Sequence, residues 1–336
     1  MDFCPVSNTV GLVGFPAFGD PVAMDAYDPS EHAGEIIVVG VPCGLGGGHQ
    51  GTAHGPNAAR AAGLFEKIAA LASTRDLGDL PLPEGSDRNE LINTWLERLR
   101  PVTREAVLAG AMPLVLGGDH SIAAGSMSGA CAGWQAREQV SPGLLWIDAH
   151  VDLNTHLTTP SGNPHGMPAA ALLGWEVDGF SRVVGNDGLF DRSRMAYVGA
   201  RDIDTGEQRH LEESGIALWS SNDVREQGVE SVMAQALATV SPNREPFCLS
   251  FDIDVVDPGF APGVDTAVPD GLSPAEAMEC MARAGDHARI VSLDLVELNP
   301  ENDVDGQTAR IAVDCINATI AAMLQTGRGT EHTDRD

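Results

Sequence analysis

The amino-acid sequence predicts an α/β protein, a three-layer α/β/α sandwich with a central, mostly parallel sheet. Two observations lead to this fold class. Short apolar runs alternate with longer stretches of helical patterning, as in chains built from strand–helix units. Most of the short runs are continuously apolar, which is typical of strands buried on both faces of a parallel sheet.

Six segments carry the strand pattern, and helical candidates lie between them. The predicted strands cover residues 35–42, 112–118, 143–150, 194–200, 246–254 and 289–297. Two helices are expected over 88–110 and 273–287. The second begins with a capping box, because Ser273 can cap the first turn while Glu276 can bond back to it.

We expect one domain of residues 35–322, preceded by an N-terminal extension of 1–34 and followed by a disordered tail of 323–336. The tail ends in "TGRGTEHTDRD", a polar and charged run. The first residues carry Asp2 and no basic segment, so we expect no secretory signal. No apolar run approaches the ~18–20 residues needed to cross a membrane, so no membrane partner is expected.

Six cysteines are scattered along the chain without a C-x-x-C pair: Cys4, Cys43, Cys131, Cys248, Cys280 and Cys315. Several lie in apolar runs such as "FCLSF", which favours reduced thiols in the core over disulfides or metal ligands. We therefore expect a cytoplasmic location.

The chain is strongly acidic. It has 48 Asp and Glu residues against 20 Lys and Arg, a formal net charge of −28, and Lys67 is its single lysine. A phosphate backbone would be repelled, so nucleic acid is not an expected partner. Three explanations are open: a solvated surface adapted to high salt, a coding bias toward arginine, and attraction of a cationic substrate. We assign most of the charge to the first two, and a few acids in a cleft suffice for the third.

Acids and histidines follow four of the predicted strands at the point where each strand ends. They are Asp119 with His120, the run from Asp148 to Asp152, Asp252 with Asp254, and Glu297. In open α/β sheets, ligands bind beyond the carboxyl ends of the strands. Each motif alone could be a loop hydrogen-bond pair, a turn before a helix cap, or acids in solvent. Four of them at successive strand ends indicate one site.

The spacing within these motifs predicts that the side chains converge. On a strand, residues at i, i+2 and i+4 face the same side, so we expect Asp148, His150 and Asp152 to point into one crevice. The same alternation applies to Asp252 and Asp254 at another strand end.

The combined set has the composition of a metal site. It holds four carboxylates and two imidazoles: His120, Asp148, His150, Asp152, Asp252 and Asp254. Clustered carboxylates resist ionisation unless cations neutralise them, and two divalent ions can share such ligands and leave room for a substrate. Oxygen ligands outnumber nitrogen and no thiolate is near, which favours Mn²⁺, with Co²⁺, Ni²⁺ and Zn²⁺ as alternatives.

Three motifs resemble the signatures of the ureohydrolases, the family of arginase, agmatinase, guanidinobutyrase and formimidoylglutamase. They are "GGDHS" (117–121), "DAHVD" (148–152) and "SFDIDVVDP" (250–258), and the resemblance runs from about residue 35 to 322. It implies an arginase-like α/β/α fold and two Mn²⁺ per subunit. The implied activity is hydrolysis of a guanidinium group to urea and an amine.

The resemblance also implies which residues hold each ion. The first ion would have the ligands His120, Asp148, Asp152 and Asp252. The second would have Asp148, His150, Asp252 and Asp254, so that Asp148 and Asp252 bridge the pair.

The loop after "DAHVD" resembles the arginase pattern, in which an Asn, a Ser and an Asn grip the α-carboxylate of arginine. In this chain they are Asn154, Ser161 and Asn163. Neutral donors suit a carboxylate, because each donated hydrogen bond favours the anion. An agmatinase need not recognise an α-carboxylate and would not require this loop.

The segment "GARDIDTGE" (199–207) resembles the part of arginase that meets the α-amino group. Asp204, with Asp202 and Glu207 near it, would supply the negative charge. By the same resemblance, Thr266 would lie close to the guanidinium group.

Two further residues complete the resemblance. His165, in "NPHGMP", matches a histidine that shuttles protons, and Glu297 matches the carboxylate that orients the guanidinium. A buried Glu is costly without a cationic partner, which fits this role. The implied reaction is attack by a metal-bridging hydroxide, with a proton delivered to the leaving amine through Asp152 and His165.

The match departs from arginase in two places. His49 and His54 in "GGGHQGTAHGPNAAR" (46–60) are not typical of arginases, and they would be exposed or would touch the substrate tail. The segment 252–273 is more similar to the bacterial agmatinase version, which bears on the substrate tail and not on the chemistry.

We therefore predict manganese-dependent hydrolysis of L-arginine, a small cationic guanidino substrate, to urea and L-ornithine. The alternatives with the same chemistry are agmatinase and other guanidino-acid hydrolases, namely guanidinobutyrase and guanidinopropionase. A non-catalytic metal-binding homologue is the alternative from another class. The resemblance implies a homo-oligomer, either a trimer or a hexamer.

Overall fold

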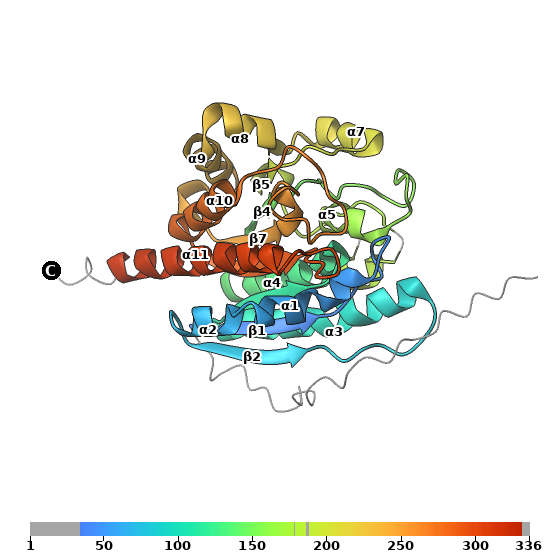
Figure 1. Ribbon diagram of the computed structural model, residues 1–336, viewed down its shortest axis with the longest axis horizontal. Helices are drawn as coiled ribbons and strands as arrows, with labels where there is room; N and C mark the ends of the chain where they lie inside the picture. Colours follow the sequence, from blue (N-terminus) through green and yellow to red (C-terminus); the bar gives the residue numbers. More distant parts are fainter. Residues whose placement is uncertain (1–33, 178, 186–187, 331–336) are drawn as a thin grey trace, which may run out of the picture.

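The computed structural model describes residues 34–177, 179–185 and 188–330 (Figure 1). Cys4, most of the predicted N-terminal extension and residues 331–336 lie outside these described residues. At the centre is one sheet of eight parallel strands in the order β2-β1-β3-β8-β7-β4-β5-β6. The predicted α/β/α sandwich is confirmed, and its sheet is parallel throughout.

The strands and helices alternate along the chain. The strands are β1 Ile36–Val41, β2 Thr74–Asp79, β3 Met112–Gly117, β4 Gly143–Ile147, β5 Met195–Gly199, β6 Ala217–Ser220, β7 Phe247–Asp252 and β8 Ile290–Val296. The α-helices are α1 Gly55–Ala61, α2 Leu64–Ala69, α3 Arg88–Ala109, α4 Ala123–Glu138, α5 Pro168–Leu172, α6 Ser181–Val184, α7 Thr205–Ser214, α8 Ser221–Gln227, α9 Val229–Val240, α10 Pro274–His287 and α11 Gln307–Thr330.

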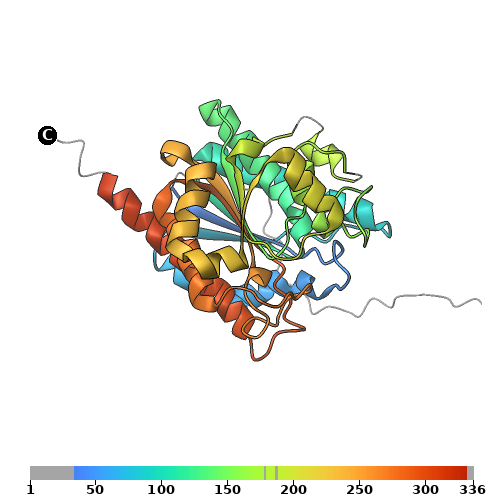
Figure 2. The ribbon, with the colours of Figure 1, turned by 90° about the horizontal axis from the view of Figure 1, so that it is seen from above.

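Helices cover both faces of the sheet (Figure 2). On one face, α2, α9, α10 and α11 bury apolar side chains such as Met233 and Ile316 against the strands. On the other face, α3, α4, α5 and α6 do the same with side chains such as Leu96 and Met127. Because both faces are covered, the inner strands must be apolar throughout, which explains the continuous apolar runs in the sequence.

The six predicted strands are present as β1, β3, β4, β5, β7 and β8, and every residue within these observed strands is buried. The prediction missed β2 and β6, which form the two edges of the sheet. β2 reads "TRDLGD" and β6 is only four residues long, and both are only partly buried. An edge strand has a partner on one side only, so it carries a weaker apolar signal.

Both predicted helices form where expected. Asp87 caps α3 by accepting a hydrogen bond from the backbone N–H of Glu90 at 2.9 Å, and Gly110 ends the helix with φ 88°. Ser273 and Glu276 form the predicted capping box of α10.

The last helix extends further than the sequence suggested. α11 continues to Thr330, so residues 323–330 of the predicted disordered tail are helical instead. The two glycines in "TGRGT" do not end the helix, because a glycine inside a helix costs only about 1 kcal/mol. Within the described residues, no helix combines the length and hydrophobicity needed to cross a membrane.

Candidate active site

The predicted metal ligands and Glu297 gather at the carboxyl ends of the four central strands, β3, β8, β7 and β4. His120 follows β3 and Glu297 follows β8, while Asp252 ends β7. The strand order makes neighbours of residues that are distant in sequence. The backbone N–H of His120 donates to Oε1 of Glu297 at 2.8 Å, across 177 positions of the chain.

The expected strand alternation after β4 is wrong. β4 ends at Ile147, so Asp148, His150 and Asp152 lie in the following loop. The loop turns because Oδ1 of Asp148 accepts the backbone N–H of His150 at 2.6 Å. Asp152 adopts a left-handed backbone with φ 50°. The three side chains still converge, but they do so through loop hydrogen bonds.

Asp252 and Asp254 converge in a similar way. Asp252 is the last residue of β7, and Asp254 lies in the one-turn 3₁₀ helix Ile253–Val255. Oδ1 of Asp252 caps this turn by accepting the backbone N–H of Asp254 at 2.8 Å. The other carboxylate oxygen of Asp252 is thereby directed at His120.

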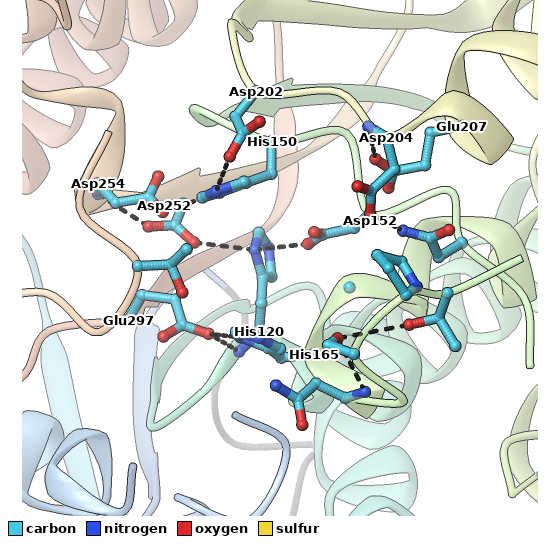
Figure 3. Close-up of a pocket in the computed structure, with 17 residues that line it drawn as sticks. His120, His150, Asp152, His165, Asp202, Asp204, Glu207, Asp252, Asp254 and Glu297 are labelled. Carbon is cyan, nitrogen blue, oxygen red and sulfur yellow. Dashed lines mark hydrogen bonds and ion pairs between the residues drawn. The ribbon is translucent and has the colours of Figure 1, made fainter. Parts of the chain in front are cut away.

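One cluster forms around the ring of His120 (Figure 3). Its Nδ1 lies 3.1 Å from an oxygen of Asp148, 3.0 Å from one of Asp152 and 3.1 Å from one of Asp252. A single ring nitrogen can donate only one hydrogen bond, so it cannot satisfy three carboxylates. A cation that faces one nitrogen and three oxygens does satisfy this arrangement.

A second cluster adjoins the first. Nδ1 of His150 lies 3.0 Å from Oδ2 of Asp254 and 3.4 Å from Oδ1 of Asp148. Asp148 contributes to both groups that could hold a metal ion, one with His120 and Asp252, the other with His150 and Asp254. Shared carboxylates are what two neighbouring ions require.

The electrostatics also fit divalent cations. Burial, followed by the charges of Asp254 and Asp148, raises the pKa of Asp252 well above its usual range. Oδ2 of Asp152 is buried and lies 3.0 Å from Nδ1 of His120, a nitrogen that it shares with two other carboxylates. Crowded, under-satisfied carboxylates of this kind are stabilised when a cation is bound.

Two supporting residues were not identified from the sequence. The indole of Trp146 stacks on the His120 ring at 4.3 Å and donates its Nε1–H to Oδ2 of Asp148 at 2.8 Å. Nε2 of His120 lies 2.8 Å from Oγ of Ser250, which leaves Nδ1 for the cluster. Each lies two residues before an aspartate of the site, so strand alternation could have revealed them.

His165 and Glu297 pair beside the His120 cluster. Nδ1 of His165 lies 2.9 Å from Oε1 of Glu297, while Oε2 of Glu297 is buried and has no hydrogen-bond partner. Glu297 also has a left-handed backbone, with φ 61°. Such conformations in residues other than glycine concentrate at functional sites. Burial lowers the pKa of His165, but the charge and hydrogen bond of Glu297 outweigh it and raise the pKa to about 9.

A cavity of about 190 Å³ opens above the two clusters. Every residue predicted to bind substrate lines it: Asn154, Ser161, Asn163, Asp204, Glu207 and Thr266. His165, Glu297 and Asp202 line the same cavity. His49 and His54 do not; His49 is exposed, and His54 lies 3.8 Å from Glu301.

Two of the acidic residues predicted to line the pocket lie at the start of α7. Asp204 and Glu207 form the capping box of this helix. Glu207 accepts the backbone N–H of Leu153 at 3.0 Å and that of Asp204 at 2.9 Å. Burial raises the pKa of Glu207 to about 8 despite these hydrogen bonds.

Asn154 and Asp204 are hydrogen-bonded to each other. Nδ2 of Asn154 donates to Oδ2 of Asp204 at 2.8 Å, and Oδ1 of Asn154 accepts from the Thr158 hydroxyl at 3.0 Å. One of the residues predicted to bind the α-carboxylate, Asn154, therefore shares a network with Asp204, which was predicted to bind the α-amino group.

The arginase family matches residues 34–321 of the chain. The chain belongs to the arginase family. This arginase-family protein is a hydrolase of the ureohydrolase type, and its two His/Asp clusters are consistent with a binuclear metal site.

Several arginases are similar to this arginase-family protein along most of their length. The arginase of Bacillus caldovelox is 35% identical over 300 residues, covering 86% of this chain and 99% of the relative. Human mitochondrial arginase-2 is 34% identical over 310 residues, covering 87% of this chain and 86% of the relative.

Solved structures with similar sequences also superpose on most of this chain. The Bacillus caldovelox arginase superposes with a TM-score of 0.80 and 34% identity, covering 85% of this chain and 98% of that one. A hypothetical agmatinase from Burkholderia thailandensis superposes with a TM-score of 0.70 and 25% identity, covering 90% of this chain and 89% of that one.

Proposed function

We propose that this protein is a manganese-dependent arginase that hydrolyses L-arginine to urea and L-ornithine. The observation that carries the proposal is the pocket, which combines two His/Asp clusters with neutral donors on one wall and acids on another. Ser161 and Asn163 provide donors for a carboxylate, and Asp204 provides an acceptor for an ammonium group. A free amino acid with a guanidinium tail has a carboxylate for the donors, an ammonium group for Asp204 and a guanidinium group for the His/Asp clusters.

The two clusters would hold the metal pair. His120, Asp148, Asp152 and Asp252 would be the ligands of one ion, and Asp148, His150, Asp252 and Asp254 those of the other. The preponderance of carboxylate oxygens over imidazole nitrogens favours Mn²⁺, with Co²⁺, Ni²⁺ and Zn²⁺ as alternatives. When bound, such a pair supplies Lewis acidity, which lowers the pKa of a water molecule toward neutrality.

Glu297 would orient the substrate. Its Oε2 is buried without a hydrogen-bond partner, so a guanidinium group that donates to it would stabilise both. Its backbone is held by the adjacent strand end, because the N–H of Glu297 donates to the carbonyl of Gly118 at 2.8 Å. This rigid placement would hold the guanidinium carbon over the metal clusters.

His165 and Asp152 would move the proton. Glu297 stabilises the protonated form of His165. A guanidinium group that takes over this carboxylate would remove part of that stabilisation and lower the pKa of His165 toward neutrality. His165 could then exchange protons with solvent at the pocket rim, while Asp152 passes a proton to the leaving amine.

One observation favours a second candidate, a guanidino acid that lacks the α-amino group. Asp204 already accepts a hydrogen bond from Asn154, so it is partly satisfied without a ligand. Guanidinobutyrate or guanidinopropionate would keep the contact with Ser161 and Asn163 and make no demand on Asp204. Agmatine has an amino group but no carboxylate, so it would use Asp204 and leave Ser161 and Asn163 without a partner.

The test is urea release from the Mn²⁺-loaded protein with L-arginine, agmatine, 4-guanidinobutyrate and 3-guanidinopropionate side by side. A kcat/KM for L-arginine at least tenfold above the others would support the proposal. Preference for a guanidino acid would support hydrolysis of a guanidinium group and show that L-arginine is not the preferred substrate. Metal binding without turnover of any of the four would mean a non-catalytic homologue.

We extend the proposal to the surroundings of the site. A single domain over 35–322 is supported by the one continuous sheet. The five cysteines within the described residues are buried and unpaired, which supports a reducing, cytoplasmic location. We also propose a homo-oligomer, a trimer or a hexamer, as the family resemblance implies.

A further inference from the structure

Arg88, the first residue of α3, reaches into the rim of the substrate pocket. Its Nε donates to the carbonyl of Leu45 at 2.5 Å, and its Nη2 donates to the carbonyl of Gly46 at 3.0 Å. The same Nη2 donates to Oδ1 of Asn163 at 3.1 Å. Arg88 thereby joins the glycine-rich loop after β1 to the substrate loop after β4.

The peptide group of Gly46 is fixed from both sides. Its N–H donates to Oδ2 of the buried Asp119 at 2.7 Å. Its carbonyl accepts from Arg88 and also from the backbone N–H of His165 at 3.2 Å. Arg88 therefore rests on a rigid support, and its guanidinium has a defined position relative to Asn163.

This contact decides which end of the Asn163 amide faces the pocket. A guanidinium group only donates hydrogen bonds, so the amide oxygen must turn toward Arg88. The Nδ2 group, which donates, is the end left for a ligand in the cavity that Asn163 lines. With the amide reversed, Nδ2 would oppose the guanidinium, and an acceptor oxygen would face the substrate.

We propose that Arg88 is a positioning residue that makes the pocket selective for a substrate carboxylate. It acts through Asn163: it holds the amide oxygen away from the pocket and presents the amide donor to the carboxylate. The inference rests on the proposed function, because it assumes a carboxylate-bearing substrate. Arg88 touches neither metal cluster, so it affects substrate binding and not the chemical step.

The test compares L-arginine with L-argininamide, which replaces the carboxylate by a neutral amide. In the Mn²⁺-loaded Arg88→Met variant, KM for L-arginine should rise about tenfold, the cost of one charge-assisted hydrogen bond. KM for L-argininamide should change less than twofold, and kcat for L-arginine should stay within about twofold. In an Asn163→Ala background, Arg88→Met should add less than a twofold further change in KM.

Arg98→Met is the matched control, because Arg98 lies on the same helix and donates to the carbonyl of Pro81 away from the pocket. Equal losses on both substrates, or a fall in kcat, would overturn the proposal by showing that Arg88 supports the loops in general. If the wild-type protein prefers L-arginine and Arg88→Met leaves its KM unchanged, the inference fails alone. If the wild-type protein prefers agmatine, which has no carboxylate, both the proposed function and the role of Arg88 are wrong.

Discussion

At the scale of single residues, the site is defined by polar groups that the protein itself leaves under-satisfied. Nδ1 of His120 faces three carboxylates, and Oε2 of Glu297 is buried without a hydrogen-bond partner. Buried polar atoms of this kind are costly, so they persist where a ligand completes them. The first matches a metal ion and the second a guanidinium group.

The pairing of His165 with Glu297 predicts a pH effect. Glu297→Gln removes the negative charge that stabilises the imidazolium, so the pKa of His165 in the metal-free protein should fall well below 9. The stability that this pairing contributes is full below about 6.5, the pKa of an unfolded-chain histidine, and is lost as pH rises through about 9. NMR titration of the His165 ring measures the shift.

Glu301→Gln serves as the control for this titration, since Glu301 pairs with His54 outside the pocket. It should leave the His165 titration where it is in the wild-type protein. An unchanged His165 pKa in Glu297→Gln would show that Glu297 does not stabilise the imidazolium.

At the scale of elements, the site depends on the close approach of the β1 and β3 ends. A Cβ atom on Gly118 would lie 1.7 Å from the carbonyl oxygen of Cys43, which is backbone and cannot move aside. Gly118 also accepts the backbone N–H of Glu297 and lies two residues before His120. Glycine at this position therefore lets two strand ends bring metal-site and substrate-site residues together.

Gly118→Ala should lower both stability and activity. Overpacking of this kind costs about 1–3 kcal/mol, which corresponds to a fall of about 2–5 °C in the unfolding temperature. Gly48→Ala is the matched control, because a Cβ atom there would meet nothing within 4 Å. Thermal unfolding and urea release with both variants measure the effect; equal behaviour of the two would disprove the close approach.

The sequence predicted the elements that carry strong local signals. The buried strands were identifiable from continuous apolar runs, and α10 from its capping box. The edge strands β2 and β6 were not, because half-exposed edges tolerate polar residues. Arg88 had no local signal, since its contact with Asn163 spans 75 positions of the chain. The convergence after β4 was predicted correctly but for the wrong reason, because a loop replaces the expected strand.

At the scale of the whole molecule, the strand order creates the site. β8 and β7 insert between β3 and β4, so four strand ends from two parts of the chain, 112–147 and 247–296, become neighbours. Carboxylates from each part then gather in one place on a chain that already carries a net charge of −28. Repulsion between these carboxylates destabilises the folded protein, so its unfolding temperature should depend on dissolved salt as well as on the metal.

The net charge predicts a salt dependence. Raising NaCl from low concentration to ~1 M shortens the Debye length from tens of ångströms to ~3 Å, which screens repulsion between surface carboxylates. The unfolding temperature of the metal-free protein should therefore rise with NaCl. An unfolding temperature that falls or stays constant would mean that the acidic surface does not destabilise the fold.

We propose that the two His/Asp clusters form one binuclear centre that hydrolyses L-arginine. A Mn²⁺ titration of metal-stripped protein, with bound metal and urea release followed together, tests this proposal. Urea release should be absent without metal and maximal at two bound ions per chain, and Glu297→Ala should bind two ions without turnover. Maximal activity with one ion or none, or two bound ions without urea from L-arginine, would show that the two clusters do not form such a centre.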